Sequence, residues 1–294
     1  NDVEKELFDF LGDDNNFNWL AQQKKYLNPK AGKYILTKGM SLNDVINLLR
    51  SGNQTPIKVS FNNQDTLEKF SGRISTQIEA DSISILEVFK DSVFLMKNKL
   101  TEASVLGILI PNTYEFYWNA SAETVANKLY QNTISFWTPS RIRQAKELGL
   151  TPGEVSTLAS IVMKESSKAD DRPKVARLYL NRLATGMKLQ ADPTVIYAIQ
   201  QEKPDAVVQR VLRKDLTIDS PYNTYKNVGL PPGPICVPEK AALLAVLEAP
   251  EHDYIFMCAD PDQPGYHAFA RNYAGHLVNQ RKWTNWLNSR KIYR

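Results

Sequence analysis

Hydrophobic residues recur at helical spacing in residues 151–165 and lead up to an acidic residue. Val155, Leu158 and Val162 fall on one stripe, which predicts an amphipathic helix with this stripe in the protein core. Glu165 takes the next position of the same stripe. A carboxylate there either reaches water at a frayed helix end, near Ser166, or lies in a partly dry groove.

This segment also begins with a strong helix-start signal. Thr151 is a good N-cap, Pro152 fits the first helical position, and Glu154 completes a capping box. If Glu165 lies in a groove, desolvation raises its pKa, and the negative end of the helix dipole acts in the same direction. A carboxylic acid that stays protonated near neutral pH is what a general acid needs.

Patterns elsewhere in the chain predict an α+β fold. We expect helices within 1–30, at 41–50, twice within 65–100, and at 122–137, 141–148, 173–183, 238–247 and the C-terminus, and strands at 32–37, 56–61, 106–118 and 254–258. The first two strands and their intervening helix form a compact unit at 30–62. Thr138-Pro-Ser interrupts the helical pattern, so we expect a domain boundary there, with an N-terminal region, 1–140, and a mixed α/β C-terminal domain, 141–294.

Composition is that of an ordinary soluble globular protein. Of the 294 residues, 43% are hydrophobic and 23% are charged, and the net charge is +4. This mild positive excess suits an acidic polymer as substrate without demanding nucleic acid. Near the end, residues 271–294 contain six Lys or Arg and no acid. Because Leu277, Trp283 and Trp286 fit one helix face, a packed terminal helix with a basic outer side is favoured over a nucleic-acid-binding arm.

Metal, redox and membrane motifs are absent from the sequence. Cys236 and Cys258 lie in apolar surroundings without motif spacing and are interpreted as buried free thiols, although the sequence does not say whether they pair. The histidines lack zinc-ligand spacing, so we expect neither a metal nor another cofactor. No stretch has the length of a transmembrane helix, and no signal peptide is visible. Because the chain begins at Asn1 instead of Met, this says little about the intact protein.

Polar clusters suited to a binding groove follow in the second half, and each has a structural explanation when taken singly. Asp192 before Pro193 commonly starts a helix or turn, and Asn223 is a turn former. Taken together, the amino-acid identities of these clusters and their order along the chain resemble the MltG (YceG-like) family of endolytic murein transglycosylases. The resemblance is carried by residues 159–165, 175–182, 189–197, 222–225, 229–235 and 267–269 and by His276, and it covers all of 150–280. A weaker similarity at 31–52 implies a LysM-like subdomain, followed by a helical linker.

The resemblance implies that Glu165 is catalytic in cleaving the β-1,4 bond between MurNAc and GlcNAc within glycan strands. Protonated Glu165 would protonate the leaving oxygen and then, as a carboxylate, take the proton of the MurNAc C6 hydroxyl, whose oxygen closes on C1 as a 1,6-anhydro end. No water enters, so the acidic pair of ordinary glycosidases is not required. Met163 stands where many family members carry another acid, so that position is not essential.

Six further polar residues are expected to hold the sugar and orient C6. They are Gln190, Asp192, Tyr222, Asn223, His267 and Asn272. The LysM-like unit would bind the glycan away from the bond that is cleaved, or it would serve only as a spacer. The resemblance also implies the periplasmic face of the bacterial inner membrane, one N-terminal membrane helix that this sequence lacks, and the peptidoglycan synthesis machinery as a partner.

Three other functions remain open from the sequence alone. A hydrolytic muramidase would use Glu165 as the acid and Asp192 as the second carboxylate, and its product would be one water heavier than an anhydro product. An inactive glycan-binding or scaffold protein would be unaffected by Glu165→Gln. A metal-dependent amidase would use His267, His276 and an Asp, and chelators would inhibit it.

Overall fold

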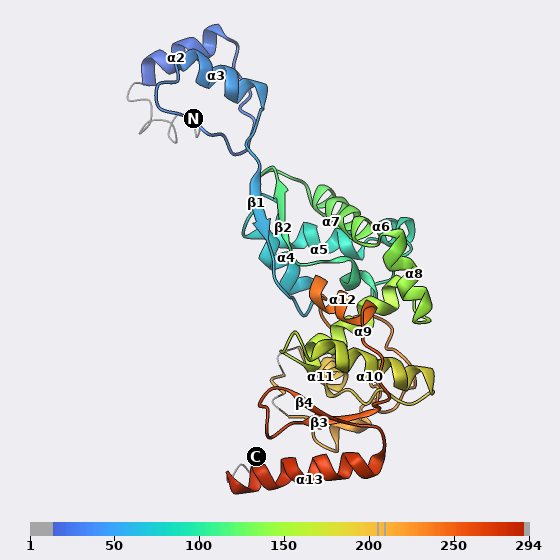
Figure 1. Cartoon of the computed structure of the whole chain (residues 1–294). Coiled ribbons are helices and arrows are strands. Elements are labelled where there is room, and N and C mark those ends of the chain that lie inside the picture. The colour runs from blue at the N-terminus through green and yellow to red at the C-terminus, as the bar shows by residue number, and fades with distance from the viewer. Residues whose placement is uncertain (1–13, 205, 209, 291–294) are drawn as a thin grey trace.

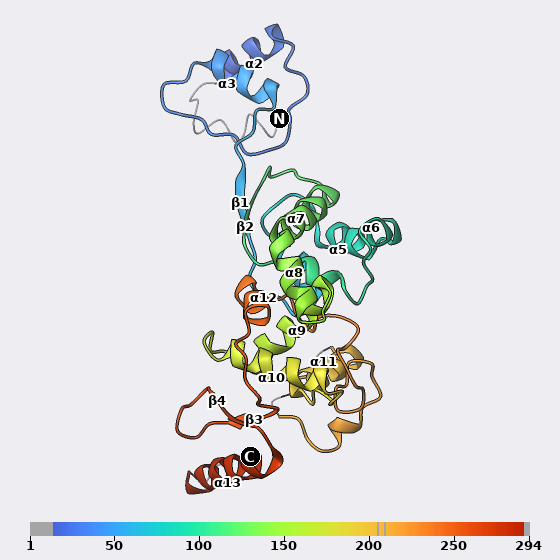
Figure 2. The ribbon, with the colours of Figure 1, turned by 45° about the vertical axis from the view of Figure 1, so that its right-hand side comes forward.

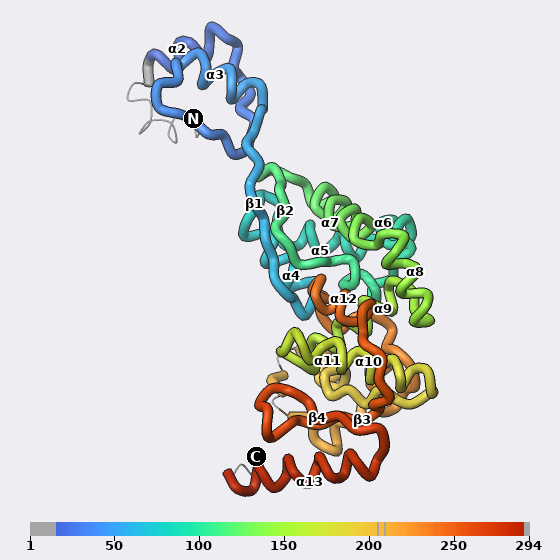
Figure 3. Tube along the Cα trace, viewed as in Figure 1, coloured from blue at the N-terminus to red at the C-terminus, as the bar shows by residue number. Residues whose placement is uncertain are grey.

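The computed structural model describes residues 14–204, 206–208 and 210–290. Three bodies follow one another along an elongated molecule: the first holds α2 and α3, the second runs from β1 to α7, and the third runs from α8 to α13 (Figure 1). The turned ribbon and the tube show the same succession (Figures 2 and 3). The mixture of helices with small sheets confirms the predicted α+β class.

The first body is a pair of helices with a small core of its own. It consists of α2 (Asp14–Gln23) and α3 (Leu42–Ser51). Ser41 caps α3 as predicted, and Gly52 ends it at a φ of 72°, a left-handed conformation that glycine adopts without strain. The strand predicted at 32–37 is wrong. Tyr34 and Leu36 of this irregular segment pack on the helix pair instead.

The second body packs helices against a two-stranded antiparallel sheet. Its elements are β1 (Ile57–Ser60), α4 (Leu67–Ser75), α5 (Ser82–Lys90), α6 (Ser92–Lys97), a 3-10 turn at Val105–Ile108, β2 (Thr113–Phe116) and α7 (Ala122–Phe136). Because β1 pairs with β2, the expected strand–helix–strand unit does not close within 30–62, and a LysM-like role stays a prediction. Three helices occupy 65–100 instead of two, since Asp91 both ends α5 and caps α6.

The third body surrounds one buried helix. Its elements are α8 (Pro139–Glu147), α9 (Pro152–Glu165), α10 (Arg172–Ala184), α11 (Asp192–Glu202), a 3-10 turn at Asp215–Thr217, α12 (Lys240–Leu247), β3 (Phe256–Ala259), β4 (His267–Ala270) and α13 (Tyr273–Ser289). Helix α9 packs against α8, α10, α11 and α12, and every residue from Val155 to Met163 is buried. Helix α9 is therefore a rigid element from which to present its last side chain.

Direct contacts join the second and third bodies close to the end of α9. The side-chain amide of Asn63 donates to the carbonyl of Val237 at 2.6 Å, and the Val237 amide donates to the carbonyl of Gln64 at 2.8 Å. Lys164 forms an ion pair with Asp65 at 2.6 Å. These contacts fix the neighbourhood of Glu165 to the second body. A domain boundary near residue 140 stays a prediction.

Helix α13 lies on the surface beside the β3–β4 hairpin (Figure 1). It is helical as predicted, but none of its residues is fully buried, and Leu277 is 38% exposed. The expected packed apolar face is therefore only partly covered. Within the described ranges of the chain, no helix is both long enough and apolar enough to span a membrane.

Candidate active site

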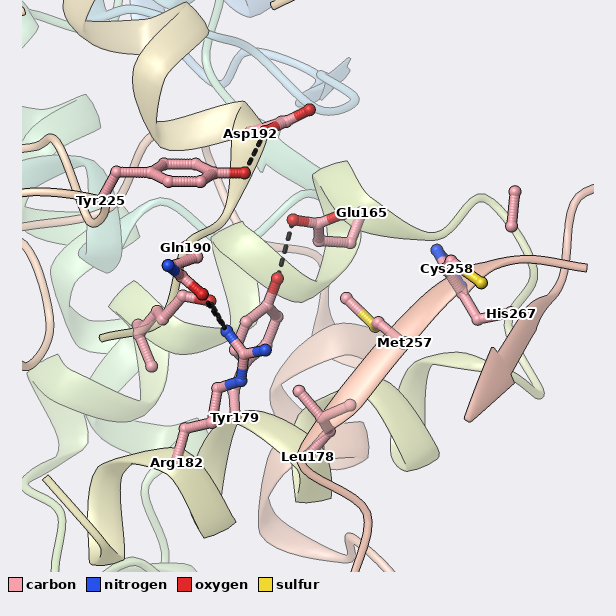
Figure 4. Close-up of a pocket in the computed structure, with 12 residues that line it drawn as sticks. Glu165, Leu178, Tyr179, Arg182, Gln190, Asp192, Tyr225, Met257, Cys258 and His267 are labelled. Carbon is pink, nitrogen blue, oxygen red and sulfur yellow. Dashed lines mark hydrogen bonds between the residues drawn. The ribbon is translucent and has the colours of Figure 1, made fainter. Parts of the chain in front are cut away.

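A pocket of about 270 Å³ opens in the third body, between α9, α10, the start of α11 and the β3–β4 hairpin (Figure 4). Its polar wall is formed by Glu165, Tyr179, Arg182, Gln190, Asp192, Tyr225, Cys258 and His267. These side chains come from widely separated parts of the sequence, because the C-terminal hairpin folds back over α10. The pocket therefore exists only in the completed tertiary structure.

Glu165 is the last residue of α9, and it faces this pocket. The helix does not fray before it, since the Ser166 amide still donates to the Val162 carbonyl at 3.0 Å. The Tyr179 hydroxyl donates to Glu165 Oε1 at 2.7 Å, and Tyr179 itself is almost fully buried. The interpretation of Glu165 as a frayed, solvated residue is thus wrong. Protein atoms surround it, and its remaining accessible surface opens into the pocket.

Burial raises the pKa of Glu165 from 4.5 to about 7. The Tyr179 hydrogen bond and the charges of His267 and Arg182 oppose this rise, whereas the carboxylate of Asp192 adds to it. Loss of hydration outweighs the opposing groups, because the pocket offers few donors to a charged carboxylate. Protonated Glu165 therefore persists at a pH well above the ordinary range of a glutamic acid, which is the condition for a general acid.

Removal of the Tyr179 hydroxyl should extend proton donation to higher pH. The hydroxyl stabilises the ionised carboxylate, so Tyr179→Phe raises the pKa of Glu165 further above its ordinary value. A reaction that needs the protonated carboxyl then loses rate at a pH higher by on the order of one unit. The measurement is the rate between about pH 5 and pH 9. Tyr130→Phe, a change in the second body, is the control, and an unmoved basic limb in Tyr179→Phe would contradict the role of the hydroxyl.

His267 and Asp171 form a second polar pair beside the pocket. His267 Nδ1 lies 2.7 Å from Asp171 Oδ2, and the Asp171 side chain is only 3% exposed. One residue earlier along both segments, the Tyr266 hydroxyl donates to Asp170 at 3.1 Å. The two contacts hold the loop after α9 against the start of β4. In Figure 4, Glu165 lies between Tyr179 on one side and His267 on the other.

Arg182 connects three walls of the pocket through backbone carbonyls. Its Nε donates to the Ile255 carbonyl at 2.7 Å. One terminal nitrogen donates to the carbonyls of Leu189 at 2.6 Å and Lys188 at 3.2 Å, and it lies 3.4 Å from Gln190 Oε1. Because Arg182 as a whole residue is only 7% exposed, little water is available to replace its guanidinium at these carbonyls. Arg182 thus holds the hairpin, α10 and the entry to α11 together.

Asp192 and Tyr225 face each other across the mouth of the pocket, where the Tyr225 hydroxyl donates to Asp192 Oδ1 at 2.5 Å. Tyr225 is presented by a turn that Asn223 organises. The Asn223 side chain donates to the carbonyls of Leu216 and Ile218, and its oxygen accepts from the Tyr225 amide at 2.9 Å. Asn223 is fully buried, so its role in this structure is to shape the turn.

The pocket brings together four of the residues predicted from the sequence, namely Glu165, Gln190, Asp192 and His267. Three others are not in its wall. Tyr222 packs its ring on Tyr197 at 4.7 Å between centroids, Asn223 is internal, and Asn272 caps α13 by accepting from the Gly275 amide at 2.9 Å. Contact of these three residues with a substrate stays a prediction.

Sequence reasoning missed Tyr179, Asp171 and Tyr225 as site residues. Tyr179 and Glu165 belong to adjacent helices, and no local pattern reveals that pairing. Both cysteines are free: Cys236 is buried, and Cys258 lies partly exposed in the pocket wall. In the part of the chain that the structure describes, no three His, Cys, Asp or Glu side chains are grouped so that they could hold a metal ion.

The similar curated proteins that we compared share one name. The chain is 28% identical to the endolytic murein transglycosylase of Bacillus subtilis (strain 168), covering 96% of this chain and 81% of that protein. It is 27% identical to the endolytic murein transglycosylase of Streptococcus pneumoniae serotype 2 (strain D39), covering 92% of this chain and 53% of that protein. The chain therefore spans about half the length of the pneumococcal relative.

A solved structure extends the similarity to the fold. The crystal structure of a YceG-like protein from Listeria monocytogenes matches with a TM-score of 0.65 at 28% identity, covering 94% of each chain. The sequence profile of the YceG-like family matches residues 2–282, a range that includes both the Glu165 helix and the hairpin with His267. Because this match takes in nearly the whole chain, the protein belongs to the YceG-like family.

Proposed function

We propose that this protein is an endolytic murein transglycosylase in which Glu165 is the general acid. The observation that carries the proposal is a carboxyl group at the end of a buried helix, facing a pocket, with its pKa raised to about 7. The names of the Bacillus and Streptococcus relatives support it. Peptidoglycan is then the substrate, and the bacterial cell envelope is the place of action.

The reaction follows from the chemistry of one protonated carboxyl. Glu165 donates its proton to the glycosidic oxygen between MurNAc and GlcNAc as that oxygen leaves C1. The C6 oxygen of MurNAc closes on C1 and forms a 1,6-anhydro ring. In the simplest form of this reaction, the same carboxylate takes the proton of the C6 hydroxyl. Since no water is consumed, the acidic pair of a hydrolase is not needed.

A hydrolytic muramidase is the second candidate, because Asp192 places another carboxylate in the wall of the pocket. In that reaction Asp192 would activate water while Glu165 protonates the leaving group. The hydroxyl of Tyr225, at 2.5 Å, already occupies one Asp192 oxygen. That oxygen is therefore not free to take a proton from water, so we prefer the transglycosylase.

Product mass distinguishes the two reactions. Purified glycan strands digested by the wild-type protein should yield fragments of several disaccharides whose new ends are one water lighter than reducing ends. In water enriched in heavy oxygen, these ends should remain unlabelled. Mass spectrometry of the fragments makes both measurements, with Glu165→Gln protein as the blank. Labelled reducing ends would establish the hydrolase and refute the transglycosylase.

Three finer assignments belong to the same proposal. They are the periplasmic face of the inner membrane, cooperation with the peptidoglycan synthesis machinery, and glycan binding by the LysM-like unit at about 30–62, most of which lies in the first body. The first body and the third body, which holds the pocket, lie at opposite ends of the molecule (Figure 1). A glycan contact on the first body would therefore hold the strand far from the bond that is cut.

A further inference from the structure

A second group able to transfer protons lies in the wall of the Glu165 pocket. His267 is the first residue of β4, and it lines this pocket. Its Nδ1 is 2.7 Å from Oδ2 of the buried Asp171. Because an ionised carboxylate only accepts hydrogen bonds, Nδ1 carries the hydrogen. In the neutral ring, Nε2 is then an acceptor with a free lone pair.

This Nε2 atom is open to the pocket. None of the described residues provides it with a hydrogen-bond partner. It is also not one of the buried polar atoms that lack a partner, which are Gln54 Oε1, Ser71 Oγ and His276 Nδ1. The atom is therefore accessible, and we infer that it opens into the pocket, because His267 is one of the lining residues. An imidazole held by a buried carboxylate on one nitrogen and open on the other has the arrangement of a general base.

We propose that His267 takes the proton of the MurNAc C6 hydroxyl, that Asp171 is its positioning residue, and that Glu165 acts only as the acid. This assignment rests on the proposed function. The Glu165 proton goes to the glycosidic oxygen as its bond to C1 breaks. The C6 oxygen forms the new bond to C1, and its proton passes to Nε2. Transfer of that proton from the imidazolium to the Glu165 carboxylate restores both groups, with no water consumed.

The charges around the pocket favour two separate residues for the two proton transfers, with Glu165 as the donor and His267 as the acceptor. After donating, Glu165 is a carboxylate in a pocket that disfavours charge, and a neighbouring imidazolium stabilises it. The carboxylate of Asp171 in turn stabilises the imidazolium. Titratable and charged groups surround His267 on every side. They are Glu165 on α9, Lys168, Asp170 and Asp171 in the loop before α10, Tyr179 and Arg182 on α10, Asp192 on α11, Cys258 and Asp260 on and after β3, and Tyr225 and Tyr266. Of these, Asp170 is held by Tyr266.

The test is the rate–pH profile of the intact protein and its variants. Wild type should show a bell-shaped profile with an acid limb and a basic limb, because the reaction needs a neutral imidazole and a protonated carboxyl at the same time. His267→Gln stays polar but cannot accept the proton, so kcat should fall about 100-fold or more, the acid limb should vanish, and KM should change little. Asp171→Asn offers Nδ1 a donor, which favours the wrong tautomer, and should also lower kcat.

Two controls separate catalysis from structure. Asp170→Asn changes the neighbouring carboxylate, which bonds Tyr266 instead of His267, and the new amide oxygen can still accept that hydroxyl, so this variant should lose far less kcat than Asp171→Asn. Added imidazole should restore part of the kcat of His267→Ala, because a free base can occupy the vacated space. A merely structural histidine would not respond in this way. Thermal melting of every variant shows whether it has folded.

The pH profile of His267→Gln tests the assignment of His267, whereas the products of the wild-type protein test the proposed function. If His267→Gln keeps the wild-type kcat at every pH, or keeps the acid limb, the assignment of His267 is overturned while Glu165 remains the acid. If the wild-type protein releases no anhydro fragments, the proposed function fails, and the assignment fails with it. Loss of the acid limb together with imidazole rescue would establish His267 as the base.

Discussion

Glu165→Gln should lower the rate of glycan cleavage by about 100- to 10,000-fold. Glutamine has nearly the same size and shape as glutamate but no carboxyl proton to donate. Its amide oxygen can still accept the hydrogen bond of the Tyr179 hydroxyl, so the pocket should keep its form. The measurement is the appearance of anhydro ends from purified glycan strands, quantified by mass spectrometry at equal protein concentration.

A matched variant lies at the other end of the same helix. Glu154 completes the capping box with Thr151, and glutamine serves that box as well, so Glu154→Gln should retain the wild-type rate. A Glu165→Gln protein with more than about a tenth of the wild-type rate would contradict general acid catalysis by Glu165.

The same substitution also reports protonation without any activity measurement. A carboxyl whose pKa is raised by folding makes a favourable contribution below its unfolded pKa of 4.5, which is lost as pH rises through about 7. The wild-type free energy of unfolding should therefore fall over this pH window relative to that of Glu165→Gln. Urea unfolding at several pH values measures this difference.

Arg182→Met should destabilise the protein by about 3 kcal/mol or more. Methionine matches the length of the apolar stem, but it leaves the carbonyls of Ile255, Leu189 and Lys188 without their donor. Burial keeps water from replacing the guanidinium, and each unsatisfied carbonyl costs about 1–3 kcal/mol. Thermal or urea unfolding measures the loss.

An exposed arginine supplies the comparison for Arg182. Arg143 lies on the outer side of α8, so Arg143→Met should change the free energy of unfolding by no more than about 0.5 kcal/mol. Equal stability losses in the two variants would mean that the carbonyl contacts of Arg182 contribute little.

Local signals in the sequence located the central helix and its acid. The cap, the proline and the capping box set the start of α9, and the hydrophobic stripe placed Glu165 at its far end, as the structure confirms. The same kind of signal placed the cap and the stop of α3. These features depend on residues within a few positions of each other, so a single sequence contains the information that they require.

Features that depend on distant residues were predicted poorly. Residues 32–37 alternate like a strand, but β1 pairs with β2, and this segment forms no strand: its Lys33 carbonyl accepts from the Thr55 amide at 2.8 Å, and its apolar side chains pack on the helix pair. The sequence pattern predicts no helix at α11, although Asp192 before Pro193 is a possible helix start. Tyr179 and Asp171 reach the site through helix and hairpin packing that no local pattern encodes. For Asn223 and Asn272, the ordinary turn and cap roles of asparagine describe what the structure shows.

The position of the β3–β4 hairpin has a consequence for the newly made chain. Protein synthesis proceeds from the N-terminus, so earlier segments emerge and begin to fold first. Helices α9 and α10 can therefore pack while Arg182 still lacks Ile255 and Asp171 still lacks His267. One side of the pocket is missing until the hairpin leaves the ribosome. An unfinished polypeptide that still lacks the hairpin thus cannot form the complete pocket.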